Sequence, residues 1–338
     1  MQEALNQFTI SGVVRLTKYI IFMTITIEGI GAFLLAIKFI PTYGVKKGIL
    51  FGIFHSVSAF CNAGFDVIGN GQSLMPFAEA ASINFIIMAL IIIGGIGFTV
   101  ILDVTQNRKF KKFSTHTKLV LTTTAGLIIG GFVLFFLLEF NNPNTLGGLS
   151  LKGKFLGALF QSVTTRTAGF NTIPLDQMTI TSQFVTVLFM FIGGSPGSTA
   201  GGVKTTTIAL VVLLVISVIK GRDDVEFQKR RISKETVQRA LTVLALAFFF
   251  LIVITLLLTV TEQSDNLMEM LFETASAIAT VGLSLGITSK LSVLGRLIII
   301  VAMFIGRLGP VTIVLALANR SNANKNLIKY PEGKVSVG

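Results

Sequence analysis

The chain has little of what an enzyme or a disulfide-stabilised scaffold requires. Its 338 residues contain one cysteine, Cys61, and two histidines, His55 and His116. A single cysteine excludes an internal disulfide and a cysteine-rich metal site. No carboxylate pair and no spacing typical of metal ligands falls within an apolar segment, so we expect no enzymatic site. Asp and Glu are also scarce within those segments, which argues against a proton relay.

Charged residues are scarce as well. They make up 13% of the chain, whereas hydrophobic residues make up 52% and the mean hydropathy is +0.79. Several apolar runs are long enough, or nearly so, for a helix to cross the roughly 30 Å of hydrocarbon in a bilayer. These runs cover residues 85–104, 119–138, 185–192 with 206–219, 240–260 and 297–318. The sequence therefore predicts an all-α polytopic membrane protein.

The net charge of +12 is distributed unevenly along the chain. Basic residues gather in two connectors and the tail, namely Arg108, Lys109, Lys111, Lys112 and Lys118, then Lys220, Arg222, Lys229, Arg230, Arg231, Lys234 and Arg239, then Arg320, Lys325, Lys329 and Lys334. By the positive-inside rule, we expect these segments in the cytoplasm and the intervening loops toward the outside of the plasma membrane. The basic residues also suit anionic membrane lipid or an acidic cytosolic partner. We expect no nucleic-acid partner.

Three lone glycines, Gly64, Gly169 and Gly282, each follow a short helix-forming stretch at nearly equal intervals. Each lies between long apolar segments, which predicts one structural unit repeated three times. We expect each repeat to comprise an outer helix, a short re-entrant helix, a glycine loop and an inner helix. The expected repeats cover residues 1–105, 106–220 and 221–320, and residues 321–338 form a cytoplasmic tail.

The expected helices follow this scheme. In the order outer, re-entrant and inner, they cover residues 13–40, 47–60 and 83–102, then 119–140, 152–165 and 184–219, then 237–260, 266–279 and 291–317. The middle helix of each set spans about 14 residues, or roughly 21 Å, which is too short to cross the bilayer. We therefore expect six spanning helices and three re-entrant pore loops around a pseudo-symmetric pore.

The glycine loops carry residues suited to bind a dehydrated monovalent cation. They are Asn62, Ala63 and Gly64, then Thr167, Ala168 and Gly169, then Thr280, Val281 and Gly282. Backbone carbonyls replace the water of such an ion without adding net charge, and glycine allows successive carbonyls to point to one axis. The re-entrant helix adds the negative end of its dipole. We interpret the loops as an ion selectivity filter; close helix packing at glycine is the alternative.

A glycine-rich interruption divides the inner helix of the second repeat. It consists of Gly193, Gly194, Ser195, Pro196, Gly197, Ser198, Thr199, Ala200, Gly201 and Gly202. Each glycine costs a helix interior on the order of 1 kcal/mol and proline about 3 kcal/mol. We expect the helix to break here and the freed backbone groups to face the pore, although a simple kink is the alternative. A phosphate-binding loop ending at Lys204 lacks the strand–loop–helix context that such loops require.

Two charged residues fall within apolar segments. Arg307 lies in the third inner segment, where a buried charge costs about 2.5 kcal/mol or more, so we expect it to face the bundle interior. From the residues alone, a structural ion pair, for instance with Glu28, is one interpretation of this arginine. Glu28 lies in the first outer helix and requires a partner. Lys204, Arg166 and Arg307 are the candidates.

Five motifs occur together in the chain. They are HSVSAFCNAGFD at 55–66, TTRTAGFN at 164–171, ATVGLSLG at 279–286, GGSPGSTAGGVK at 193–204 and YPEGK at 330–334. With them, essentially the whole chain resembles the Trk/Ktr/HKT superfamily of potassium transporters, most of all its Ktr membrane subunits. The resemblance implies potassium as the transported ion, held at the filter carbonyls, with sodium as a candidate coupling or activating ion and no bound cofactor.

The resemblance also implies roles for particular segments and partners. The interruption corresponds to a gating loop beneath the filter, and Arg307 to a charge that opposes cation flow in the closed state. A homodimer and a cytosolic nucleotide-binding regulatory ring are the implied partners. Members of the superfamily have four repeats, and this sequence shows three. Because the interruption belongs to the third family repeat and falls here in the second, the unit not present is the first.

The first family filter helps to separate potassium carriers from sodium carriers. Its position is not among the three repeats of this sequence, and the three glycines that are present favour potassium. A transporter of sodium, or of monovalent cations with poor selectivity, is therefore one alternative. An incomplete fragment of the potassium transporter that does not function is the other.

Overall fold

The computed structural model describes residues 10–69, 71–263 and 266–309. Its α-helices are α2 (Ile10–Tyr43), α3 (Val45–Phe60), α4 (Ala81–Ile96), α5 (Phe98–Asn107), α6 (Thr115–Glu139), α7 (Leu151–Thr164), α8 (Ile180–Phe191), α9 (Thr205–Ile219), α10 (Lys234–Glu262), α11 (Leu267–Ala279) and α12 (Val293–Leu308). The 3₁₀ helices are η1 (Met75–Phe77), η2 (Phe110–Lys112) and η3 (Thr288–Lys290), and β1 (Val225–Phe227) pairs with β2 (Arg230–Ile232). The predicted tail and the end of the predicted helix 291–317 lie outside the described residues.

The helices repeat one pattern three times along the chain, as the sequence predicts. A long outer helix (α2, α6 or α10) is followed by a short helix (α3, α7 or α11) and then by an inner segment. The three outer helices are long and apolar enough to cross a membrane. Serine caps fix where two of them begin, because Ser114 accepts the N–H of Thr117 and Ser233 accepts that of Thr236.

Two of the three inner segments are interrupted, one of them where the sequence analysis expects a continuous helix. In the first repeat, α4 and α5 meet at 98°, and Gly97 between them has a φ of +96°, which favours glycine. In the second, residues 192–204 separate α8 from α9, as predicted. The described residues therefore hold three helices of spanning length, or four if α4 and α5 count as one bent span. The continuous inner helix expected over residues 83–102 is wrong, because the chain bends sharply at Gly97. In the third repeat, α12 is continuous over the described residues.

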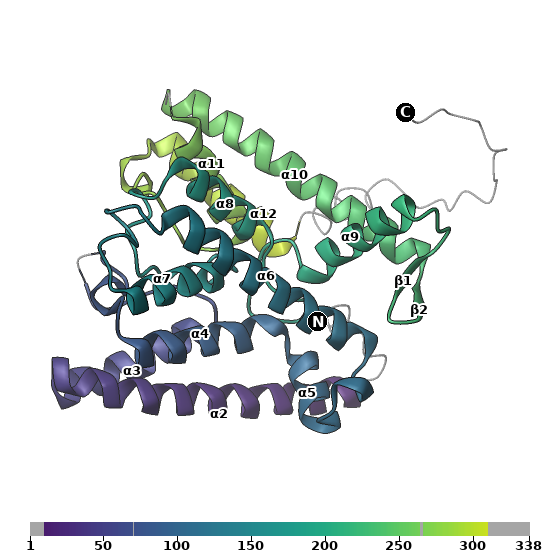
Figure 1. Ribbon diagram of the computed structural model, residues 1–338, viewed down its shortest axis with the longest axis horizontal. Coiled ribbons are helices and arrows are strands. Elements are labelled where there is room, and N and C mark those ends of the chain that lie inside the picture. Colours follow the sequence, from purple (N-terminus) through teal and green to yellow (C-terminus); the bar gives the residue numbers. More distant parts are fainter. Residues whose placement is uncertain (1–9, 70, 264–265, 310–338) are drawn as a thin grey trace.

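The short helices have the lengths expected of re-entrant helices, with 16, 14 and 13 residues in α3, α7 and α11. Only Gly44 separates α2 from α3, so the chain reverses direction at once and α3 packs along α2. In Figure 1 the three short helices occupy the left half of the molecule, whereas α9 and the β1–β2 hairpin lie at the right. The three repeats thus place their short helices on the same side.

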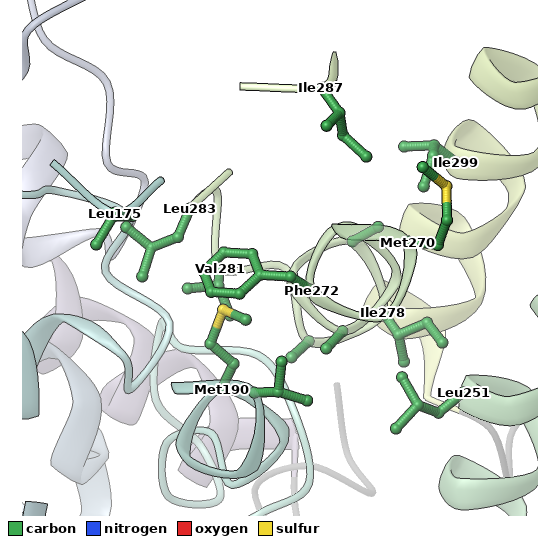
Figure 2. Close-up of a cluster of buried hydrophobic side chains, with 14 of the residues drawn as sticks. Leu175, Met190, Leu251, Met270, Phe272, Ile278, Val281, Leu283, Ile287 and Ile299 are labelled. Carbon is green, nitrogen blue, oxygen red and sulfur yellow. The ribbon is translucent and has the colours of Figure 1, made fainter. Parts of the chain in front are cut away.

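Hydrophobic clusters surround these short helices. Figure 2 shows Phe272 of α11 on the side of Met190 of α8, and Ile278 of α11 on the side of Leu251 of α10 and Ile299 of α12. All five side chains are at most 6% exposed. A second buried cluster joins α2, α3, α4 and α7. Close packing of this kind leaves the short helices little freedom to move and makes them a rigid support for the loops at their ends.

Candidate ion-binding site at the glycine loops

The three glycine loops, residues 62–64, 167–169 and 280–282, share one backbone conformation. Each ends on a glycine with positive φ, at +71° in Gly64, +85° in Gly169 and +91° in Gly282. Each begins on another residue with positive φ, at +51° in Asn62, +68° in Thr167 and +53° in Thr280. Positive φ is uncommon outside glycine and costs free energy, so the surrounding structure must impose it. The repeat seen in the sequence is therefore a repeat of backbone geometry as well.

The glycines allow the three loops to meet. A Cβ atom on Gly64 would lie 2.5 Å from the carbonyl oxygen of Ala168, and one on Gly169 would lie 2.5 Å from that of Val281. A Cβ atom on Gly282 would lie 3.7 Å from the Cα of Gly169. Real Cβ atoms essentially never come within 3.0 Å of another heavy atom. The first two positions therefore admit glycine alone, and carbonyl oxygens of one loop face the glycine of the next.

A hydroxyl near the end of each short helix holds its loop in place. Ser58 donates to the carbonyl oxygen of Phe65 at 2.8 Å, and Thr164 donates to that of Phe170. In the third repeat, Ser276 accepts a bond of 3.1 Å from the N–H of the loop glycine. These bonds fix each loop to the C-terminal end of its helix, where the helix dipole is negative. The arrangement favours a cation at the meeting point of the loops.

A polar cavity of about 360 Å³ lies against the loops on one side. All three loop glycines line it, together with hydroxyls such as those of Ser284 and Thr288 and one carboxylate, Asp66. Glu273, which is 6% exposed, accepts hydrogen bonds from both Ser284 and Thr288 and so orients their hydroxyls. Oxygen-rich walls of this kind suit a hydrated cation. The cavity can therefore serve as an entrance to the loops.

The interruption segment, residues 193–202, lies on the side of the loops away from the polar cavity. Its contact with the first loop is made by Thr199. The hydroxyl of Thr199 lies 2.9 Å from the carbonyl oxygen of Phe60 and 3.1 Å from that of Gly94. The same hydroxyl accepts a bond of 2.8 Å from the side-chain amide of Asn62. Asn62 is 6% exposed, so this bond satisfies a buried donor. Thr199 thus joins the interruption segment directly to the first glycine loop.

Contacts with the second and third loops come from Gly201. Its N–H donates to the hydroxyl of Thr167 at 3.2 Å. A Cβ atom at this position would lie 2.6 Å from the carbonyl oxygen of Ala279 and would overlap the hydroxyl of Thr280. The backbone of the interruption segment therefore fits directly beneath the loops, and no larger residue can occupy this position without displacing it.

The interruption segment also packs against the bend between α4 and α5. The N–H of Phe98 donates to the carbonyl oxygen of Gly197 at 3.0 Å, and the N–H of Ser195 donates to that of Gly95 at 2.9 Å. A Cβ atom on Gly97 would lie 2.6 Å from the carbonyl oxygen of Pro196. The sequence analysis did not predict this contact between the bend and the interruption segment. Three glycines between residues 94 and 97 were the available signal.

A second cavity, of about 320 Å³, lies beneath the interruption segment and is lined by two basic residues, Lys204 and Arg307. Arg307 lies with Nη1 3.5 Å from the carbonyl oxygen of Thr199, and Lys204 donates from Nζ to that of Ala200 at 2.8 Å. None of the described residues that line this cavity is acidic. Arg307 is an exposed residue at the wall of this cavity, and together with Lys204 it places positive charge below the loops. Its orientation toward the bundle interior stays a prediction.

Glu28 has a different partner from the three that the sequence analysis proposes. Its carboxylate accepts a hydrogen bond from Sγ of Cys61 at 3.6 Å. Lys204 and Arg307 donate hydrogen bonds to the interruption segment instead. Arg166 is 3% exposed and lies 3.5 Å from the hydroxyl of Thr124. The expected pairing is therefore wrong, because nearer oxygen atoms already receive these side chains.

Known proteins resemble this chain along its length. The family model described as "TrkH: Cation transport protein" matches residues 1–327. The chain is 43% identical to Ktr system potassium uptake protein B of Bacillus subtilis and 40% identical to potassium/sodium uptake protein NtpJ of Enterococcus hirae, in both cases over 100% of this chain and 75% of the relative. The crystal structure of the potassium transporter TrkH from Vibrio parahaemolyticus shares the fold, with a TM-score of 0.72 and 19% identity. That match covers 90% of this chain and 64% of the other, less than two thirds of its length.

Proposed function

Because the chain belongs to the TrkH family of cation transport proteins, we propose that it is a membrane-embedded subunit that translocates potassium in a cation uptake system. The meeting of the three glycine loops carries the proposal, since it gathers backbone carbonyls at one place between two cavities. Relatives from Bacillus subtilis and Vibrio alginolyticus that are named potassium uptake proteins support potassium as the ion.

In this proposal the glycine loops act as the selectivity filter. The carbonyl oxygens of Ala168 and Val281 lie against neighbouring loops, and that of Ala63 would lie 4.0 Å from a Cβ atom on Gly282. Such oxygens replace the water that a potassium ion loses on entry. The C-terminal ends of α3, α7 and α11 add negative potential at the same point. The polar cavity is the vestibule from which the ion enters.

The interruption segment acts as the gate. Bonds through Thr199 and Gly201 hold it directly beneath the loops, where it obstructs the path of an ion. It consists mostly of glycine and other small residues, so it can move at modest cost. Arg307, in the cavity beneath the segment, adds positive charge on the path and repels a cation in the closed state.

Sodium transport is the second candidate. The relative from Enterococcus hirae is named a potassium/sodium uptake protein. A filter of carbonyls separates the two ions by the number and field strength of its oxygens. The glycine at the end of each loop, which lets carbonyls face the axis, favours the larger ion.

Orientation and partners follow from the charges and from the names of the relatives. We propose that the basic connectors and the tail face the cytoplasm, which the excess of Lys and Arg supports. We also propose a homodimer that binds a cytosolic nucleotide-binding regulatory ring. Relatives named as parts of a Ktr system support assembly with another component.

Uptake of radiolabelled potassium and sodium into proteoliposomes that contain the chain tests the function. We expect potassium uptake to exceed sodium uptake. Gly169→Ala should reduce potassium uptake about tenfold or more, since overpacking costs on the order of 1–3 kcal/mol. Gly130→Ala is the matched control, because a Cβ atom there meets nothing within 4 Å. Uptake of neither ion would overturn the proposal, and a preference for sodium would establish the second candidate.

A further inference from the structure

We propose that the first basic connector, residues 108–118 between α5 and α6, binds the phosphate headgroups of anionic phospholipids in the surrounding bilayer. Three observations carry the proposal: positive charge without a counter-charge, an exposed aromatic side chain within the same turn, and the angle at which α5 leaves α4. The proposal does not depend on ion transport by the glycine loops.

The connector holds positive charge that faces solvent. Its cations are Arg108, Lys109, Lys111, Lys112 and Lys118, with no Asp or Glu between them. All but Lys118 are exposed. The acidic residue that precedes the connector, Asp103, is already engaged, because its carboxylate accepts the N–H of Ser114 at 2.9 Å and a bond from the side chain of Asn107. The connector therefore presents an uncompensated positive surface.

The second basic connector, between α9 and α10, offers a contrast. Acidic residues are interspersed there, and they pair with its arginines. Arg222 lies 3.5 Å from Glu226, and Arg231 lies 3.3 Å from Asp224. In the part of the chain that the structure describes, no ion pair involves the first connector. An anionic ligand therefore meets free charge at the first connector and partly neutralised charge at the second.

An exposed aromatic ring stands among the cations of the first connector. Phe110 is 47% exposed, and its ring centroid lies 5.8 Å from that of Phe113. Nζ of Lys118 donates to the carbonyl oxygen of Lys111 at 3.0 Å and lies 6.0 Å from the centre of the Phe110 ring. These contacts give the turn a defined shape. A phenyl ring beside lysines suits the bilayer interface, where the ring enters the acyl boundary and the ammonium groups reach phosphates.

The direction of α5 brings this turn to the membrane surface. α5 turns off the line of α4 at 98°, and the bond from Phe98 to Gly197 fixes the bend. Figure 1 shows α5 leaving the line of α4. A helix that leaves a segment lying across the bilayer at a right angle runs along the plane of the membrane. An acidic soluble partner would gain nothing from the exposed ring, so the combination of ring, cations and bend favours lipid.

The absence of tryptophan from the chain allows a direct test. Phe110→Trp in the full chain introduces one fluorescent reporter at the connector. The variant is reconstituted in mixed bilayers of phosphatidylglycerol and phosphatidylcholine, with brominated chains, which quench tryptophan on contact, on one lipid at a time. We expect phosphatidylglycerol to quench several-fold more strongly at equal mole fraction. Raising the salt concentration should weaken this preference, because it screens exposed charge.

Two matched triple variants then separate the connectors. Lys109→Gln with Lys111→Gln and Lys112→Gln should bring the ratio of quenching by the two lipids close to one. Lys229→Gln with Arg230→Gln and Lys234→Gln removes the same charge from exposed positions of the second connector and should leave the ratio unchanged. The proposal is overturned by equal quenching in the parent, by a ratio that the first variant leaves unchanged, or by a reporter that neither lipid quenches.

Discussion

Thr199 joins the interruption segment to the first glycine loop, and removing its hydroxyl should open the path. Thr199→Val keeps the shape of the side chain but loses the bond to the carbonyl oxygen of Phe60 and the bond from Asn62. Each bond contributes about 0.5–1.5 kcal/mol net, so the closed position loses about 1–3 kcal/mol. At about 1.4 kcal/mol per factor of ten, the open population should rise about 5- to 150-fold.

Potassium flux in proteoliposomes measures this change. The flux should rise in Thr199→Val as long as the closed position dominates in the parent. Thr199→Ser is the control, because it keeps the hydroxyl and should keep the low flux. The ratio of potassium to sodium flux should stay constant if the loops themselves are undisturbed. Unchanged flux in Thr199→Val, or an equal rise in Thr199→Ser, would refute the gate assignment.

Three further changes test other contacts. Gly201→Ala places a Cβ atom against the hydroxyl of Thr280, so we expect the segment to be displaced and potassium flux to rise; a lower flux contradicts this. Arg307→Gln removes a charge beneath the loops and should raise inward flux, whereas Arg307→Lys should not; equal fluxes rule out an electrostatic role. Hydrogen bonds from Ser150 lower the pKa of Glu79 below its ordinary value of 4.5. The contribution of the carboxylate to stability is therefore fully present above pH 4.5 and is lost as the pH falls through the lower folded pKa. Glu79→Gln should lower the melting temperature at neutral pH, and the difference from the parent should shrink as the pH falls below 4.5; a pH-independent difference contradicts this.

Hydrophobicity and glycine spacing predicted much of the fold. Outer helices and short helices are set by apolar length and by local caps such as Ser114 and Ser233, which a single sequence displays. The bend at Gly97 was not predicted. At the bend, the carbonyl oxygen of Pro196 leaves no room for a side chain at Gly97, and the N–H of Phe98 bonds to Gly197. Such a contact joins residues far apart in the chain, and one sequence does not reveal which glycines meet.

For the candidate site, the sequence identified the residues but not all of their partners. The repeated position of Gly64, Gly169 and Gly282 predicted that these residues act together, and the structure brings their loops into contact. The pairing of Glu28 was predicted wrongly, because charge alone suggested a cation. The structure supplies a nearer partner in Cys61. The roles of the loops as a filter and of residues 193–202 as a gate stay predictions.

The position of a bound ion tests the central claim most directly. Thallium or rubidium, used in place of potassium, gives anomalous scattering that locates the ion in crystals of the chain. We expect a peak between the glycine loops, coordinated by the carbonyl oxygens of Ala63, Ala168 and Val281 and absent in Gly169→Ala. No ion between the loops at saturating concentration, or a peak confined to the cavity that contains Arg307, would contradict a filter built from these carbonyls.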